Sequence, residues 1–269
     1  MGTSIEGGLQ LTPPVYAEGV LFGDVPGNQP KQAIDEISET QQHRLGTKLI
    51  YADGRVFRYA KNGGTALAKA LMTTSEALNA RATEELQSTY GTSAEIGDKE
   101  FDVDVTTGGT WVENEYAEGF LVVNKATGIG DFYKIVANKI NASDDTLMRI
   151  QIADALRTAL DATSELTFVK SPWRDVDVMP TTAEGTPAGI PLVTVTASYW
   201  CWLQTGGYAA CIVDTGETIV KGGPVGFPAD PAVAGACGPI GADTDQQWGV
   251  GVFIATEAEA AIIDLKLDS

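Results

Sequence analysis

The sequence has few of the side chains on which most enzymes depend, with one histidine and three cysteines in 269 residues. A single histidine, His43, excludes histidine-rich metal sites and limits histidine-based triads and acid–base relays to that one residue. We expect His43 to be a solvated side chain in a polar, helical segment. The cysteines show no Cys-x-x-Cys spacing, so a zinc site is not expected. The sequence therefore predicts no metal, no cofactor and no catalytic residues.

Cations are also scarce, because 18 Lys and Arg stand against 36 Asp and Glu and give a formal net charge of −18. This charge repels phosphate backbones and anionic lipid headgroups, so neither nucleic acid nor a membrane is expected as a direct partner. The N-terminus has no basic stretch followed by an apolar one, and no long apolar run occurs. We therefore expect synthesis in a cytosol, where thiols stay reduced.

Glycine, threonine and valine are abundant, and this composition favours short strands joined by turns. In the stretch LIYADGRVFRYAKNGG, residues 49–64, Asp53-Gly54 predicts a tight hairpin. A second hairpin is expected within residues 191–214, with Thr205-Gly206-Gly207 at its tip. From Phe101 onward the apolar residues recur with a period of two, which is typical of strands.

The second expected hairpin is rich in aromatic residues. Alternation along its first strand places Trp200 and Trp202 on one face, and Tyr199 and Cys201 on the other. The tryptophan pair either faces the protein's own core or forms an interface with another subunit, and both alternatives stay open. Cys201 and Cys211 lie on the two arms of this hairpin, and a disulfide between them also stays open.

Three segments have helical patterns. They are residues 31–44, the second half of residues 65–87, and residues 153–165, the last being a short helix or a turn. The expected fold is mainly β. It consists of short-strand β-barrel or β-sandwich modules with two or three short helices and an extended N-terminal arm.

The expected domain division begins with the arm. Residues 1–44 contain the breakers Pro13-Pro14 and Pro26-Gly27 and have scattered apolar residues, so they are expected to form an arm held by contacts outside its own subunit. Residues 45–269 are expected to form the mainly β body, with a possible subdivision near residues 140–190.

Carboxylates are the abundant reactive groups, and two pairs have strand spacing. Asp102 with Asp104, and Asp175 with Asp177, would each lie on one face of a strand. A solvated outer face is the ordinary explanation for such pairs, while a calcium site and a pair of catalytic acids are the alternatives.

The first hairpin concentrates cations and aromatic rings. Arg55 and Arg58 lie beside Phe57 and Tyr59, and arginine with tyrosine is a composition that protein interfaces favour. We expect this hairpin to contact a neighbouring protein. The alternative is that Phe57 and Tyr59 fill the protein's own core.

Four segments together resemble a family of tailed-phage virion structural proteins that decorate or cement the head. They are LGTKLIYADGRVFRYAKNGGTALAKA (residues 45–70), GDFYKIVAN (130–138), IQIADALRTALDATSELTFVKSPW (150–173) and GIPLVTVTASYWCWLQTGGYAACIVD (189–214). The resemblance implies a mostly β protein on the capsid exterior of the virion, commonly a homotrimer where capsomers meet. It implies the major capsid protein and the protein itself as partners, and it brings no catalytic residues.

A tail or baseplate structural protein, and a receptor-binding protein that binds or degrades glycans, are the alternative functions. The residues expected at interfaces are Leu9, Leu11, Tyr16, Phe22, Arg55, Arg58, Tyr59, Trp200 and Trp202.

Overall fold

Two compact units make up the protein, and one is inserted into the sequence of the other. The barrel unit covers residues 78–171, and the body unit combines residues 13–77 with residues 172–269. The expected subdivision near residues 140–190 contains the second boundary, whereas the sequence pattern did not mark the first. The computed structural model describes residues 20–24, 27–76, 85–87, 94–105, 112–141, 144–182, 185–240 and 246–268.

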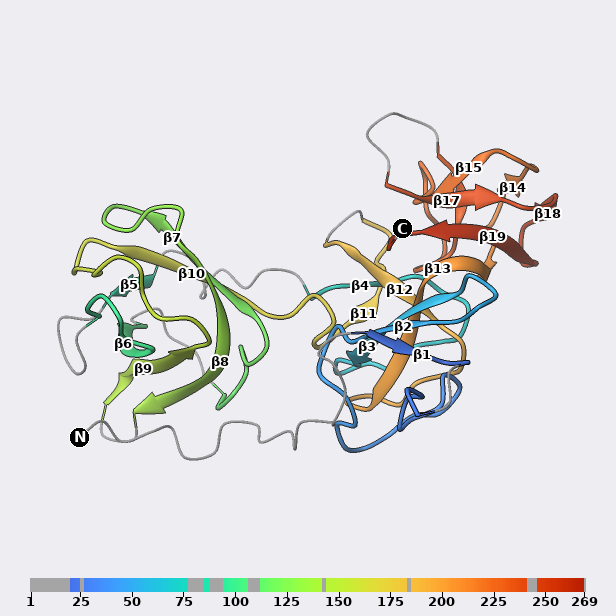
Figure 1. Ribbon diagram of the computed structural model, residues 1–269. Coiled ribbons are helices and arrows are strands. Elements are labelled where there is room, and N and C mark those ends of the chain that lie inside the picture. The colour runs from blue at the N-terminus through green and yellow to red at the C-terminus, as the bar shows by residue number, and fades with distance from the viewer. Residues whose placement is uncertain are drawn as a thin grey trace. The chain divides into compact units, whose positions relative to one another are not determined.

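The barrel unit is a closed antiparallel sheet with the strand order β10-β5-β6-β9-β8-β7 (Figure 1). Inward side chains, among them Phe101, Leu121, Tyr133 and Phe168, form one core. Closure pairs each of these strands on both sides. The strands are β5 (Glu85–Gln87), β6 (Glu100–Asp104), β7 (Phe120–Lys125), β8 (Phe132–Asn141), β9 (Asp144–Ile152) and β10 (Glu165–Val169).

The body unit is built on a sheet whose main path is β1-β2-β3-β13-β19-β17-β15-β16. β12 pairs with both β4 and β13, β11 pairs with β4, and β14 and β18 form a separate two-stranded sheet. The strands are β1 (Val20–Phe22), β2 (Lys48–Ile50), β3 (Val56–Lys61), β4 (Thr73–Thr74), β11 (Asp177–Val178), β12 (Pro187–Pro191), β13 (Trp200–Ile212), β14 (Thr218–Ile219), β15 (Pro224–Gly226), β16 (Gly238–Pro239), β17 (Gln247–Gly251), β18 (Ala255–Thr256) and β19 (Ala260–Lys266).

The barrel unit is inserted between two paired strands of the body. β4 precedes the insertion and β11 follows it, and they are antiparallel, with Thr73 opposite Val178. The body chain therefore leaves and re-enters at adjacent points, which is the arrangement that tolerates an inserted domain.

β13 is one continuous strand, where the sequence predicted a hairpin with Gly206-Gly207 at its tip. The strand continues because it changes partners: β3 pairs with its first half and β19 with its second half. A register shift occurs at Gly206, and a Cβ at Gly207 would lie 2.5 Å from the carbonyl oxygen of Gly54. The hairpin prediction was wrong because glycines mark a bulge or a close backbone approach as well as a turn.

The three cysteines are free and buried. Cys201 and Cys211 lie ten residues apart on the same strand, a separation of about 30 Å that no disulfide spans. Burial raises the pKa of Cys201 to about 12. A hydrogen bond with Cys237, together with burial, raises the pKa of Cys211. Both thiols therefore stay protonated near neutral pH, which is the unreactive form.

The mainly β character is confirmed, but the described part of the chain contains no helix. It therefore contains no helix that could cross a membrane. Residues 31–44 form turns and bends instead, because the side-chain amide of Gln32 donates to the carbonyl oxygens of Glu36 and Trp200, at 2.7 and 3.0 Å. Residues 153–165 also lack a helix. Of the helix expected in the second half of residues 65–87, residues 77–84 lie outside the described residues, and residues 85–87 form strand β5 instead.

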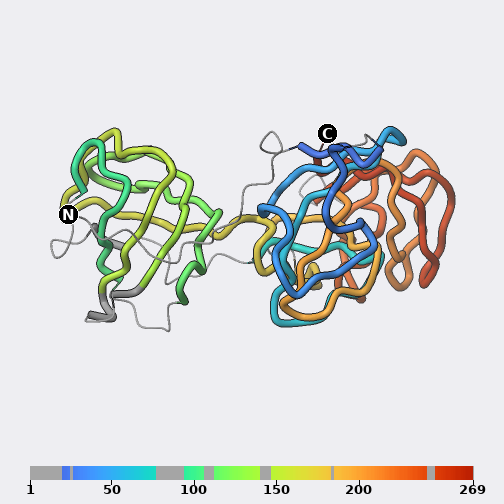
Figure 2. The backbone as a smooth tube through the Cα atoms, turned by 60° about the horizontal axis from the view of Figure 1, so that its bottom comes forward, coloured from blue at the N-terminus to red at the C-terminus, as the bar shows by residue number. Residues whose placement is uncertain are grey.

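The described part of the expected N-terminal arm belongs to the body. Strand β1 pairs in parallel with β2, and Leu21 is buried in the body core. The segment after it, residues 27–44, runs along the body in blue toward the orange β13 (Figure 2) and pairs there through Ser38 and Trp200. The arm prediction was wrong for these residues because the anchors that cover them come from the same chain.

Asp102 in the barrel unit is buried, although a solvated outer face was the ordinary explanation for its spacing with Asp104. Arg149 lies directly opposite on β9, and its Nε and Nη2 donate to the two carboxylate oxygens at 2.9 and 2.8 Å. A fixed bidentate guanidinium compensates the buried charge, and local spacing does not reveal such a partner.

We expect Arg149→Ala to lower the unfolding free energy of the barrel unit by about 3–5 kcal/mol, because the carboxylate stays buried without its two guanidinium hydrogen bonds. Arg157→Ala is the matched control, since the side chain of Arg157 is 62% exposed and its Nε lies 3.4 Å from the carboxylate of Asp131. It should change stability by about 1 kcal/mol. Urea unfolding followed by circular dichroism measures both variants. An equal loss of unfolding free energy in the two variants would show that the buried Arg149–Asp102 pair contributes no more than the exposed Arg157–Asp131 pair.

Candidate functional site

The outward side of three adjacent body strands carries several apolar residues around Asp264. Tyr208 and Ala210 lie on β13, Ile262 on β19, and Val250 and Val252 on and just after β17. Tyr208 is 64% exposed and Ile262 is 42% exposed. We call these five residues the outer face.

Strand register brings the residues of the outer face together. Tyr208 and Val250 both pair with Asp264, so these three residues form one row across β13, β19 and β17. Ala210 pairs with Ile262 in the next row. Because alternate residues of a strand point to the same side, the rows form one surface over three adjacent strands.

The opposite side of these strands fills a core. Ala209, Cys211, Ile263 and Leu265 pack there with Trp248. Antiparallel sheets with one buried side normally carry polar residues on the other side. The outer face departs from this pattern, and exposed apolar patches of this kind are typical of protein contact sites.

The segment that supplies these strands is acidic. Residues 172–268 hold twelve Asp and Glu and three Lys and Arg. Two of those cations have acidic neighbours, since Arg174 lies 3.8 Å from Asp175 and Lys266 lies 3.4 Å from Asp264. A partner surface with apolar side chains inside a border of lysine or arginine therefore complements the outer face.

A pocket of about 290 Å³ lies beside β4 and β11 and is lined in part by Glu76, Asp175 and Asp177. Lys61 holds the carboxylate of Asp175 at 3.2 Å, and Arg174 approaches it from another side. Among the described residues, no group of three or more His, Cys, Asp or Glu is arranged to hold a metal ion. Asp175 is thus an ion-pair partner rather than a free acid or base.

Three residues expected at an interface lie in the body's own core. Tyr59, Trp200 and Trp202 pack in one cluster, and none is more than 8% exposed. The predicted division of faces is confirmed, because Cys201 packs in a different cluster. The core alternative therefore describes the aromatic residues, and their assignment to an interface is corrected. Side chains that fill the core around β13 cannot reach a partner.

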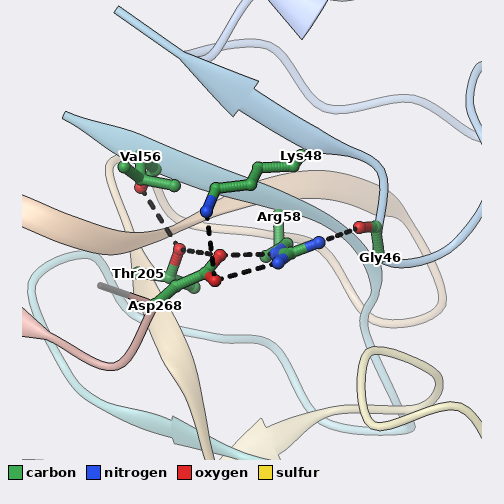
Figure 3. A network of polar contacts seen from close by, with 6 residues as sticks. All are labelled: Gly46, Lys48, Val56, Arg58, Thr205 and Asp268. Atoms are coloured by element: carbon green, nitrogen blue, oxygen red, sulfur yellow. Dashed lines mark hydrogen bonds and ion pairs between the residues drawn. The ribbon is translucent and has the colours of Figure 1, made fainter. Parts of the chain in front are cut away.

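Arg58 is also engaged within the body (Figure 3). Its guanidinium donates two hydrogen bonds to the carboxylate of Asp268 and one to the carbonyl oxygen of Gly46. The Nζ of Lys48 and the hydroxyl of Thr205 each lie 3.4 Å from an oxygen of the same carboxylate. Burial raises the pKa of Asp268, but the hydrogen bonds and charge of Arg58 outweigh burial and lower it overall. The network ties the chain after β19 to β3.

We expect Asp268→Asn to destabilise the body unit by about 1–3 kcal/mol, because it removes the charge that pairs with a half-buried Arg58. Asp53→Asn is the control on the neighbouring hairpin turn, where the side chain of Asp53 is 51% exposed and pairs with Arg55. The control should change stability by about 1 kcal/mol or less. Thermal unfolding of both variants tests this, and an equal loss for Asp53→Asn would contradict a special role for the network.

Arg55 and Phe22 are the interface candidates that stay accessible. The first predicted hairpin is confirmed, because β2 and β3 are antiparallel and Gly54 at the turn has a φ of +89°. The guanidinium of Arg55 lies 5.1 Å from the ring centroid of Tyr51. Phe22 is exposed on β1. An interface role for both residues stays a prediction. The remaining candidates, Leu9, Leu11 and Tyr16, lie outside the described residues.

His43 is buried rather than solvated, with 2% of its surface exposed. The rings of Tyr59 and Trp202 lie 5.2 and 5.3 Å from its ring, and its Nε2 accepts the backbone N–H of Lys31. Burial, aided by the charge of Lys31, lowers the pKa of His43 to about 4. The surface prediction was wrong because the rings that cover His43 are distant in sequence.

The pKa of His43 is lower in the folded protein than in the unfolded chain, so the unfolded state binds more protons between about pH 4 and pH 6.5. The contribution of the neutral His43 ring to the unfolding free energy is fully present above about pH 6.5, and it is lost as the pH falls from there to about pH 4. Between about pH 7.5 and pH 5 we expect a loss of up to about 2 kcal/mol that is missing in His43→Gln. Denaturant titrations at both pH values measure it. Identical pH slopes for wild type and variant would refute it.

Comparisons with known proteins give no relatives. No family model matches this chain, and searches of curated proteins and of solved structures find no match.

The sequence analysis missed the outer face, although a signal was present. Residues 260–263 are apolar at four successive positions, where a strand with one solvated side would carry a polar residue at every second position. Such a run indicates a strand with apolar residues on both sides.

Proposed function

We propose that this protein is a non-catalytic structural protein that decorates the outside of a tailed-phage head and stabilises the shell. The observation that carries the proposal is the outer face, a group of exposed apolar residues around Asp264 across three strands of an acidic segment. The resemblance suggests the major capsid protein as the partner. The outer face offers that partner a surface with the chemistry of a protein contact.

The stabilisation follows from mass action. A protein that binds the assembled shell but not its separated subunits stabilises the shell by about 2.7 kcal/mol per site at a hundredfold excess over Kd. Full burial of one large apolar side chain contributes about 1.5–3 kcal/mol. Burial of outer-face side chains would act on this term by lowering Kd, against the cost of association.

The bound form is proposed to be a homotrimer, since an external protein at a threefold junction touches the most neighbours. The net charge of −18 opposes self-association in solution, and salt weakens that repulsion. A tail or baseplate location is the alternative. The glycan-degrading alternative is disfavoured at the described pocket, because Lys61 and Arg174 hold Asp175.

We expect Ile262→Glu to weaken binding to phage heads stripped of this protein by about tenfold or more, because it places a charge within a desolvated contact. Val233→Glu is the control, since Val233 is 38% exposed and lies in a turn outside the strands of the outer face. Sedimentation of labelled protein with heads measures the affinity, and circular dichroism checks the fold.

Equal affinity for the wild type and Ile262→Glu would remove the outer face as the contact. Binding of the wild type to tails and not to heads would remove the proposed location.

A further inference from the structure

Residues 27–44 lie over the aromatic core cluster of the body, and we call this segment the strap. The strap is described throughout and contains no helix or strand, although Ser38 makes one bridge to Trp200. Its side chains are exposed or half-buried except for those of Gln32 and His43, which are 1% and 2% exposed. Both buried side chains are polar, so hydrogen bonds have to compensate their burial.

Gln32 joins the strap to the strands beneath it. Its side-chain amide donates to the carbonyl oxygen of Trp200 at 3.0 Å, and its side-chain oxygen accepts the hydroxyl of Tyr59 at 2.7 Å. Its backbone carbonyl oxygen accepts the indole N–H of Trp202 at 2.9 Å. The hydroxyl of Tyr59 in turn accepts the backbone N–H of Gln42 at 3.0 Å. Strap atoms therefore satisfy the polar groups of the aromatic cluster.

His43 holds the strap together through an acceptor atom. Its Nε2 accepts the backbone N–H of Lys31 at 3.1 Å, and the rings of Tyr59 and Trp202 lie against it. Both nitrogens of a protonated imidazole are donors. Protonation of His43 therefore removes this hydrogen bond, directs one N–H at another and leaves a cation under two rings.

The groups around the His43 ring do not compensate such a cation. Lys31 belongs to the strap, and its positive charge disfavours the protonated ring as burial does. Tyr59 on β3 stays neutral in acid because burial raises the pKa of its hydroxyl, and β13 presents a neutral indole. The strap carboxylates of Glu36 and Glu39 accept other hydrogen bonds, from a backbone N–H and from a tyrosine hydroxyl.

The strands beneath the strap are held by their own pairing. β13 pairs with β3 along its first half and with β19 along its second half, and β12 pairs with it as well. The apolar contacts of the strap come from Ile34 and Ile37, which are only half-buried. A segment with few buried apolar contacts opens at a lower free energy than the strands of the core.

We propose that the strap is an acid-released cover, in which protonation of His43 opens residues 27–44 and uncovers the rings of Tyr59 and Trp202 while the body strands stay paired. The proton comes from solvent and binds at Nε2, and the N–H of Lys31 turns to water. The opened body presents an aromatic surface that is buried at neutral pH. The proposal uses contacts within one chain and does not depend on the proposed function.

Hydrogen exchange of the full-length protein tests the proposal, read by mass spectrometry and corrected for the intrinsic exchange rate at each pH. The opening constant of the strap should rise about 30-fold between pH 7.5 and pH 5, because opening returns His43 to its ordinary pKa of about 6.5. A peptide from β9 in the barrel unit is the reference, and its protection should not change.

The same data separate local opening from unfolding of the body. At pH 5 the strap should exchange at least about tenfold faster than a peptide from β13. Equal protection of these two peptides would mean that the strap opens when the whole body unfolds, and this result overturns the proposal. A strap opening constant that does not change with pH also overturns it.

Three variants identify the titrating group. His43→Gln keeps an acceptor for the N–H of Lys31 but binds no proton, so the pH dependence of strap exchange should disappear. Lys31→Gln removes the charge that disfavours the protonated ring, so the 30-fold rise should become smaller, and this variant decides the question if His43→Gln leaves the strap open at every pH. Glu39→Gln is the carboxylate control and should keep the wild-type rise. A full rise in Lys31→Gln or His43→Gln, or a lost rise in Glu39→Gln, overturns the proposal.

Discussion

The body of this protein depends on β13, a strand that is packed on both sides. Trp200 and Trp202 enter one cluster, while Cys201 and Leu203 enter another. Both edges are also used, since β3 and β12 flank the first half and β19 pairs with the second half. A shift of one residue would move each of these side chains into the wrong cluster, so the register is strongly specified. The preceding loop is fixed to it as well, because the indole N–H of Trp202 donates to the carbonyl oxygen of Gln32 at 2.9 Å.

Local pattern predicted β6, β7, β8 and β9 of the barrel unit and the first hairpin, because alternation and an Asp-Gly turn are properties of neighbouring residues. It did not predict β5, which lies in a segment with a helical pattern. The helix expected at residues 31–44 failed because Gln32 bonds to the backbone of Trp200, 168 positions away. The burial of His43 depends likewise on Tyr59 and Trp202. No window of neighbouring sequence contains these contacts, so they could not be predicted.

The candidate site also combines features that neighbouring residues predict with contacts that only strand pairing creates. The segments that carry the family resemblance contain β2, β3, β10 and β13 and parts of β8, β9 and β12. Their glycines and aromatic residues serve packing, as the close approach of Gly207 to Gly54 illustrates. The resemblance therefore bears chiefly on the fold. The argument for a contact surface rests instead on Tyr208 and Ile262, which lie together only because β13 and β19 are paired.

The central claim is that the outer face of the body contacts the shell of a phage head. A cryo-electron microscopy reconstruction of heads carrying this protein tests it most directly. The account predicts density outside the shell into which the body fits with Tyr208 and Ile262 against the capsid protein. Density in which the outer face is turned to solvent, or density confined to the tail, would contradict it.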